Sequence, residues 1–255
     1  AMASVNYFNY QNPIDKNKDG FTDVTLQNRF TIFNKWNWEQ RYHTRASIAA
    51  RYVFEDRWGG QLNWNKQWRG SDSIYGESIY TNRFELIGLY PLPMKENVTL
   101  QFSYNWHNQN SYYGTTPFMA KQHVGFVQLF WDQTIFKKHA LLIGAAMRFT
   151  YYDDNTAATT ANNGKLNNSM KTPLPGIFMQ EEWSISPMHK LLAGYRFDYD
   201  IIHKAIHSPR IAYKFSPSKK HTLRLSFGTG FRVVNLFTED HAALTGSRDV
   251  VLTEK

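Results

Sequence analysis

The amino-acid sequence predicts an all-β protein, an antiparallel transmembrane β-barrel with about ten strands. Apolar and polar residues alternate over segments about twice as long as ordinary strands, and short connections alternate with long ones along the chain. Aromatic residues make up 16 % of the 255 residues, although the mean hydropathy is only −0.53. Disordered chains lack aromatic residues, so disorder is excluded. The longest apolar run, 140–147, is too short for a transmembrane helix.

Period-two alternation is clearest at residues 98–106. Val98, Leu100, Phe102, Tyr104 and Trp106 alternate there with polar residues, which indicates a strand with one apolar and one polar face. The same pattern recurs at 141–151, 191–199 and 223–231. Strands of this length are typical of a membrane barrel rather than of a soluble sandwich. The side chains expected to face lipid are Leu100, Phe102, Tyr104, Ile143, Met147, Phe149, Tyr195, Phe197, Leu223 and Leu225.

A longer element is predicted at 42–68, where even-numbered positions stay mostly apolar. The phase does not slip across Gly59 and Gly60. We interpret this stretch as one long or bulged strand, with a turn at 55–60 as the alternative.

The connections between these segments fall into two classes. Short ones are expected at 37–41, 91–96, 137–139, 187–189 and 217–220, and long polar ones at 11–24, 70–78, 108–122, 153–176 and 234–250. One connection, the 201–206 hairpin, is short although it falls where the alternation expects a long one. Outer-membrane barrels have short periplasmic turns and longer extracellular loops, so the alternation favours that class.

Aromatic residues gather near the ends of the expected strands, as in the girdles at both membrane interfaces. The alternative is that aromatic residues favour any sheet. The expected girdle residues are Trp36, Trp38, Tyr90, Trp106, Trp131, Tyr151, Tyr152, Trp183 and Tyr199.

Composition excludes several function classes. The formal net charge is +8, but the basic residues are scattered singly, so no nucleic-acid partner is expected. The chain has no cysteine, which excludes disulfides and thiolate sites. Adjacent carboxylates such as Asp153 and Asp154 point to opposite faces of a strand and cannot act as a catalytic pair. No catalytic residues are predicted, and the protein is not expected to be an enzyme.

One loop has the spacing of a calcium site. Asp15, Asn17, Asp19 and Asp23 place oxygen ligands at intervals, and Gly20 suits a tight turn. Leu26 stands where an EF-hand has its bidentate glutamate, and no flanking helix is expected. Ca²⁺ is therefore the one cofactor that the sequence suggests, and an Asx-rich surface loop is the alternative.

Arginines on the polar faces would give a closed barrel a basic lumen that attracts anionic or metal-chelate ligands. The alternative for each arginine is pairing with a carboxylate. The set comprises Arg29, Arg45, Arg51, Arg83, Arg148, Arg196, Arg210 and Arg224.

Ligand capture is expected at the long loops, where aromatic rings could cover a planar or macrocyclic ligand and arginines could meet its charge. The alternative is that these side chains only pack the loops together. The predicted ligand-binding residues are Trp68, Arg69, Tyr75, Tyr112, Tyr113, Arg232, Phe237 and Arg248.

Two segments carry a recognisable motif. Residues 209–217 read PRIAYKFSP and residues 223–232 read LRLSFGTGFR. Together they resemble a mid-barrel signature of TonB-dependent outer-membrane receptors, and the continuation at 235–241 resembles a Bacteroidetes subgroup. Val234 stands where that signature has proline. The resemblance implies a barrel of about 22 strands, of which residues 1–255 would be a portion without the plug domain and the C-terminal strands.

The resemblance also implies a function and a location. The chain would form part of a receptor in the bacterial outer membrane for TonB-energised uptake of a scarce nutrient, such as an iron-siderophore, cobalamin (vitamin B12) or haem. Its partners would be that small ligand, the TonB complex through the plug, outer-membrane lipids and a surface lipoprotein. A passive porin or a β-barrel enzyme of the outer membrane would give the same strand pattern, and a soluble all-β carbohydrate-binding protein is a third alternative.

Overall fold

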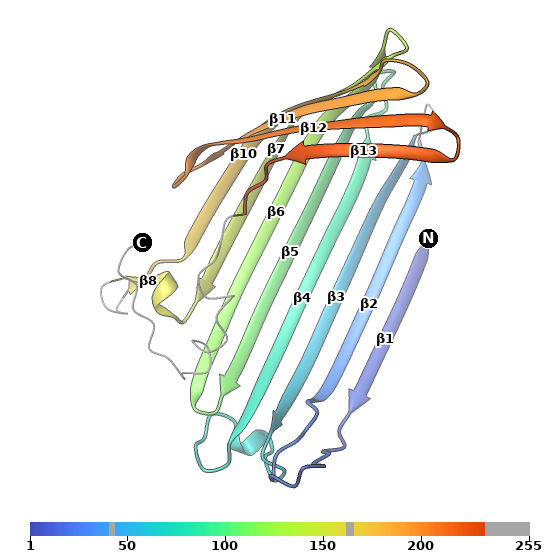
Figure 1. The fold of residues 1–255 in the computed structure, drawn as a ribbon. Coiled ribbons are helices and arrows are strands. Elements are labelled where there is room, and N and C mark those ends of the chain that lie inside the picture. Colours follow the sequence, from blue (N-terminus) through green and yellow to red (C-terminus); the bar gives the residue numbers. More distant parts are fainter. Residues whose placement is uncertain (41–43, 162–165, 233–255) are drawn as a thin grey trace.

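The computed structural model describes residues 1–40, 44–161 and 166–232. Eleven of its strands form one antiparallel sheet in which neighbours along the chain are neighbours in space (Figure 1). No helix in these ranges is both long enough and apolar enough to span a membrane. The strands of the sheet are β1 (Met2–Tyr10), β2 (Leu26–Glu39), β3 (Arg45–Gly60), β4 (Gly76–Pro91), β5 (Val98–Tyr113), β6 (Thr116–Ile135), β7 (His139–Asp154), β10 (Met170–Ser184), β11 (His189–Asp200), β12 (Lys204–Ser218) and β13 (His221–Gly228).

The sheet curls strongly along its width. Strands β1 to β7 run side by side, and β11 to β13 cross the view at a steep angle to them (Figure 1). The smaller elements lie in the loops: η2 (Lys66–Trp68), η3 (Ala157–Thr159) and the paired strands β8 (Thr160–Ala161) and β9 (Leu166–Asn167). A twisted antiparallel sheet of this kind forms the wall of a barrel.

The strand register assigns every strand residue to one of two faces. Residues paired across an antiparallel ladder share a face, so a continuous row joins Leu100, Leu129, Ala145, Ile177 and Phe197. We call this side of the sheet the apolar face and the other side the polar face. All ten side chains predicted to face lipid lie on the apolar face, which confirms the predicted alternation.

The apolar band is long enough for a strand to cross a membrane core. On β5 the band runs from Val98 to Trp106, a span of about 27 Å at 3.4 Å per residue. A transmembrane strand tilted by about 45° needs about 9 to 11 residues, and the nine residues from Val98 to Trp106 meet that length. Beyond the band, Asn108 and Asn110 continue the same face as polar residues.

Aromatic residues border this band at both ends. Trp38, Tyr90, Trp131 and Trp183 lie toward the short turns, and Trp106, Tyr151 and Tyr199 toward the long loops. Trp36 also lies on the apolar face. The prediction was wrong for Tyr152, which alternation puts on the polar face. It is buried there and donates a hydrogen bond to Asp154 at 2.7 Å.

Connections of the two classes lie at opposite ends of the strands, as predicted. The short turns are 40–44, 92–97, 136–138, 185–188 and 219–220. The longer loops 11–25, 61–75 and 155–169 are all at the other end, together with the brief 201–203 hairpin. The predicted loop 234–250 lies outside the described residues.

The element predicted at 42–68 is shorter in the structure. Its strand is β3, which has no turn at 55–60 and ends at Gly60, where φ is +147°. The apolar pattern continued because the following loop folds back over the apolar face. Trp64 packs on Gly76 of β4 so closely that a Cβ there would lie 2.3 Å from the indole.

The predicted long loop at 108–122 is wrong. These residues belong to β5 and β6, which are joined by a tight turn at residues 114 and 115. Gly114 has a φ of +58°, which suits such a turn. The strands extend past the apolar band, where both faces contact water, so alternation fades although the backbone ladder continues.

Few side chains are fully buried, as expected of a single sheet. The main buried cluster lies on the polar face near the long loops and contains Tyr113, Phe118, Ala120 and Tyr152. Ile79 of β4 and Met170 of β10 pack against it. This cluster fixes the long-loop ends of β4 to β10 relative to one another.

Arginine in the middle of the apolar band should destabilise the barrel. We expect Phe102→Arg or Ile143→Arg to lower the free energy of unfolding in bilayers by about 2 to 4 kcal/mol, because a guanidinium would enter hydrocarbon. Equilibrium unfolding of the full-length protein in lipid vesicles measures this. Ser103→Arg, next to Phe102 but on the polar face, is the control and should cost far less. Equal losses for Phe102→Arg and Ser103→Arg would contradict the assignment of faces.

Candidate functional site

The polar face carries all of the arginines predicted to line a lumen. Register places Arg29, Arg45, Arg51, Arg83, Arg148, Arg196, Arg210 and Arg224 on this one side of the sheet. A barrel closed around this face would have arginines lining its interior.

Carboxylates neutralise part of this charge. Glu85 accepts from Arg51 at 2.5 Å and from Arg83 at 2.7 Å. Arg196 forms a bidentate ion pair with Asp198, and both N to O distances are 2.7 Å. Asp198 is fully buried, and a Cβ on Gly176 would lie only 2.2 Å from its carboxylate oxygen. Pairing with a carboxylate, the alternative role for each arginine, therefore holds for three of these eight positions.

A cleft of about 300 Å³ lies at the long-loop end, between loop 11–25 and the ends of β3 and β4. Backbone bonds tie the loop to β3, since Thr22 donates its N–H to the carbonyl of Gly60 at 2.8 Å. The polar face contributes Arg57 and Glu77 to the lining, and Tyr75 comes from the loop before β4. With Asp23 from loop 11–25, the cleft therefore holds two carboxylates, one guanidinium and an aromatic ring.

Tyr75 places a phenol ring and its hydroxyl in this cleft. Its hydroxyl donates to Glu77 at 2.8 Å, and its ring lies 6.4 Å from that of Phe21. Desolvation, together with the neighbouring Glu77 carboxylate, raises the pKa of Tyr75 to about 12. The phenol therefore stays protonated at neutral pH.

Arg57 supplies the positive charge. Its side chain is half-buried, and within the described ranges no carboxylate forms an ion pair with it. A half-buried guanidinium without a partner can bind an anion through two parallel hydrogen bonds.

The predicted residues Arg69 and Tyr112 lie elsewhere, on the apolar side of the sheet beyond the band. The Arg69 guanidinium lies between two rings, 4.6 Å from Tyr80 and 4.4 Å from Tyr112. It also donates to Ser78 at 2.5 Å and to Asn110 at 2.6 Å. These contacts hold loop 61–75 against the outside of the wall, so the structure does not bring Arg69 and Tyr112 together with Tyr75.

Lys66 of η2 strengthens this attachment. Its ammonium donates to the buried carboxylate of Asp56 at 2.6 Å and lies 5.4 Å from the ring of Trp58. The hydrogen bond to Asp56 raises the pKa of Lys66 above its usual value. Trp68 ends η2 and is half-buried there.

The other predicted ligand residues are dispersed. Tyr113 is buried in the polar-face cluster, and Arg232 is exposed after the end of β13. Phe237 and Arg248 lie outside the described residues. Among the described members of the predicted ligand-binding set, only Tyr75 lines the cleft. Sequence reasoning missed Arg57 and Glu77, although the odd-numbered position of Arg57 on β3 places it on the polar face.

The loop with calcium spacing is held by backbone hydrogen bonds. Asp15 accepts from the N–H groups of Lys18 at 2.6 Å and Gly20 at 3.0 Å, and Asp23 accepts from that of Lys16 at 2.7 Å. Within the described part of the chain no group of three or more histidine or acidic side chains is placed to hold a metal ion. Calcium binding by Asp15, Asn17, Asp19 and Asp23 stays a prediction.

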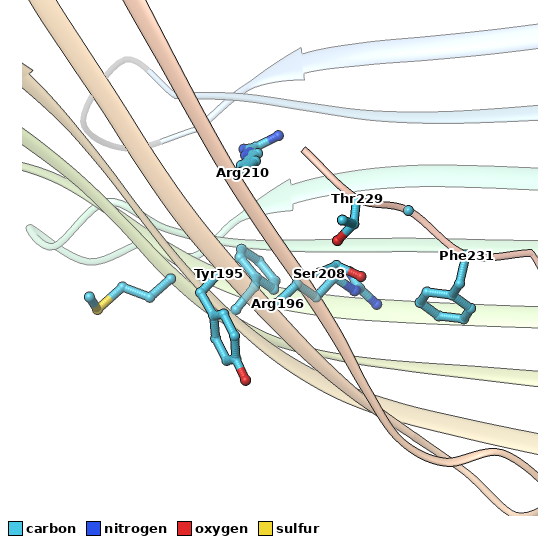
Figure 2. A pocket seen from close by; sticks show the side chains of 9 residues that line it. Tyr195, Arg196, Ser208, Arg210, Thr229 and Phe231 are labelled. Atoms are coloured by element: carbon cyan, nitrogen blue, oxygen red, sulfur yellow. The ribbon is translucent and has the colours of Figure 1, made fainter. Parts of the chain in front are cut away.

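A second cleft of about 370 Å³ lies at the edge of the sheet (Figure 2). It opens where β13 ends at Gly228 while β12 begins as early as Lys204. Arg196 and Arg210 line it from the polar face, and Tyr195 and Met179 from the apolar face. Its lining comes from both faces of the sheet beside the end of β13, and none of the residues predicted to bind a ligand lines it.

Comparison with known families decides between the barrel classes. Residues 2–243 match the family described as "TonB dependent receptor-like, beta-barrel". The chain belongs to this family. The sequence resemblance is thereby confirmed, and the polar face is the inner face of a receptor barrel.

Solved structures support the same fold for this receptor barrel. A mutant ferric enterobactin receptor from Pseudomonas aeruginosa superposes with a TM-score of 0.58 at 10 % identity, covering 86 % of this chain and 35 % of that one. A ferric enterobactin receptor in complex with BCV-L6 gives 0.59 at 12 % identity, with 89 % and 37 % covered. The chain thus spans about a third of the receptor structures that it resembles. Curated proteins give no match.

Removing the Arg69 side chain should release loop 61–75 from the receptor wall. We expect Arg69→Ala to cost about 2 kcal/mol of local stability, because two ring contacts are lost and buried Ser78 loses its partner. Proteinase K digestion of the full-length protein should then cut within 61–75 several times faster. Gln67→Ala, in the same loop but with an exposed side chain, is the control. Unchanged cleavage of Arg69→Ala would show that other contacts hold the loop.

Proposed function

We propose that this chain forms part of the barrel wall of an outer-membrane receptor for TonB-energised uptake of a small, scarce nutrient of the iron-siderophore class. The observation that carries the proposal is the register. It gathers apolar side chains on one face of eleven strands and all eight predicted arginines on the other. In a member of the TonB dependent receptor family, this arrangement suits a wall between lipid and a ligand passage.

The position of the cleft supports ligand capture from outside the cell. In outer-membrane barrels the longer loops face the exterior. The cleft containing Arg57 and Tyr75 lies at the end where 11–25, 61–75 and 155–169 are found. A ligand arriving from outside would therefore meet this cleft before the paired arginines of the inner wall.

The chemistry of the cleft suits a ligand that offers an anionic group to Arg57, hydrogen-bond donors to Asp23 and Glu77, and a flat group to the aromatic rings. Arg57 supplies a guanidinium that forms no ion pair within the described residues, Tyr75 a phenol, and Phe21 an exposed ring beside it. Ferric siderophores combine negative charge with such groups, as haem does, and the likeness to solved ferric enterobactin receptors places siderophores first in this proposal. The similar solved receptors are ferric enterobactin receptors, one of them in complex with enterobactin.

Coupling to TonB belongs to the same proposal. The barrel wall would supply the passage and the outer binding residues, and a plug domain would transmit energy from the TonB complex. A surface lipoprotein could cover the same long-loop end. The residues of this chain would then bind and position the cargo without altering it chemically.

Loss of the Arg57 charge should weaken capture of an anionic siderophore. We expect Arg57→Gln to lower the affinity of the full-length receptor for a ferric catecholate siderophore about tenfold to a hundredfold, because one charge-assisted contact is lost. Tyr75→Ala should also weaken binding. Binding measured on purified receptor gives the affinity, and uptake of iron-55 by cells gives the transport activity.

Arg45→Gln is the matched control, since Arg45 lies on the same strand and face but at the short-turn end. It should leave affinity unchanged. Wild-type binding by both Arg57→Gln and Tyr75→Ala would remove the cleft from the proposal. Uptake of cobalamin or haem with no siderophore uptake would overturn the proposed substrate class.

Labelling of intact cells tests the orientation. A membrane-impermeant thiol reagent should reach Lys18→Cys in loop 11–25 but not Lys138→Cys in the turn 136–138, because these residues lie at opposite ends of the strands. These 255 residues contain no cysteine that would compete for the reagent. The reverse pattern would invert the topology.

A further inference from the structure

Three charged side chains line the cleft at the long-loop end, and they do not neutralise one another. Arg57 comes from β3, Glu77 from β4 and Asp23 from loop 11–25. Within the described residues, neither carboxylate forms an ion pair with Arg57 or with another basic side chain. One positive and two negative charges therefore face the same cleft, which gives it a formal net charge of −1.

The strand register holds the charges of β3 and β4 apart. Glu77 pairs with Gly59 across the ladder, and Arg57 lies two residues before Gly59 on the same strand and face. Arg57 and Glu77 are thus diagonal neighbours, with Cα atoms about 7 to 8 Å apart. Gly59 has no side chain, and a Cβ built on it would lie 3.3 Å from Oγ1 of Thr22 in loop 11–25. The missing side chain leaves room beside the Glu77 carboxylate.

Each carboxylate is held in place through one of its two oxygen atoms. Oε1 of Glu77 accepts from the hydroxyl of Tyr75 at 2.8 Å. Oδ2 of Asp23 accepts from the N–H of Lys16 at 2.7 Å. The second oxygen of each carboxylate has no hydrogen-bond donor among the residues that the structure describes. Both carboxylates are therefore oriented by the protein and still have an oxygen that can accept from a ligand.

The nearest other charges on the polar face do not line the cleft. Glu55 precedes Arg57 by two residues on β3 and accepts a hydrogen bond from the amide of Gln27. Arg29 of β2 is paired with Glu55 in the register. Neither Glu55 nor Arg29 contributes to the lining. The charge that a ligand meets in the cleft is therefore set by Asp23, Arg57 and Glu77.

A ligand group of one charge sign would satisfy only part of this cleft. An anionic group would bind Arg57 but would be repelled by two carboxylates, and a cationic group would be repelled by the half-buried guanidinium. A group that carries both signs can form charge-assisted hydrogen bonds with all three side chains. The volume of about 300 Å³ is at the lower limit for a ligand pocket, so the cleft takes one end of a cargo.

We propose that this cleft recognises a zwitterionic end of the cargo, with an acidic group for Arg57 and a protonated amine for Asp23 and Glu77. The inference deepens the proposed function and rests on it, because it names the class of siderophore. The amine donates to the second oxygens of the two carboxylates, and the guanidinium donates to the acid. Tyr75 is a positioning residue, since its hydroxyl holds the Glu77 carboxylate.

Three ferric trihydroxamates with the same iron-binding groups separate the two charges. Ferrioxamine G is a linear chain with a terminal ammonium and a terminal carboxylate. Ferrioxamine B has only the ammonium, and in ferrioxamine E the two ends are joined as an amide. Quenching of tryptophan fluorescence gives their affinities for the purified full-length receptor. We expect ferrioxamine G to bind at least tenfold more tightly than ferrioxamine E, because only ferrioxamine G offers both charges.

Charge-neutralising variants test each side of the cleft. In Asp23→Asn/Glu77→Gln the affinity for ferrioxamine G should fall at least tenfold, while unchanged binding of ferrioxamine E shows that the variant is folded. Arg57→Gln should weaken binding of ferrioxamine G but strengthen that of ferrioxamine B, because repulsion of the ammonium is lost. The matched control is Asp72→Asn/Glu96→Gln, which makes the same charge change at exposed residues outside the cleft. It should bind all three compounds like the wild type.

Equal binding of ferrioxamines G and E by the wild type, or an unchanged preference in Asp23→Asn/Glu77→Gln, would overturn this inference. Equal loss in the control would also overturn it, because overall charge would then be responsible. Tight binding of ferric enterobactin without binding of any ferrioxamine would exclude the zwitterionic cargo and leave the proposed function standing. Failure to bind any ferric siderophore would overturn the proposed function, and this inference with it.

Discussion

The register of one continuous antiparallel ladder is the constraint on which the rest of the structure depends. A membrane core offers the backbone no hydrogen-bond partners, so each strand must complete its bonds with its neighbours. Because side chains alternate, the register also decides which face each residue occupies. A slip of one residue in β3 would carry Arg51 into hydrocarbon and Tyr52 to the inner wall. Strand pairing and the separation of charge from lipid are therefore the same constraint.

The sequence could predict the fold where lipid on one side and water on the other determine the type of each residue along a strand. Alternation from Val98 to Trp106 reflects a strand with lipid on one side and water on the other, and the structure confirms it. The prediction failed at 108–122 because the strands continue beyond the membrane, where both faces contact water. Pairing persists there through the backbone, which every residue type except proline can provide with both a donor and an acceptor. Composition then resembles that of a loop, and only Gly114 marks the turn.

The candidate site was less predictable, because loop composition does not show the direction in which a loop folds. Trp68, Arg69 and Tyr75 belong to one loop, yet Arg69 is fixed between Tyr80 and Tyr112 on the outside while Tyr75 reaches the inner cleft. Rings beyond the apolar band lack lipid to cover them, and a guanidinium covers them well. The position of Arg57, in contrast, follows from strand parity once β3 is known to reach Gly60.

Arg57 differs from the other arginines in its ion pairing and in how far its guanidinium is exposed to water. Arg51 and Arg83 share Glu85, so a ligand would have to compete with an existing ion pair. Arg148 is exposed on a wide polar face, where water screens its charge. Arg57 is half-buried in a cleft beside a protonated phenol, and a partly desolvated charge attracts an anion more strongly than an exposed one. On the inner face, Arg57 is therefore suited to recognising a ligand, whereas Arg51 and Arg83 hold the wall together through Glu85.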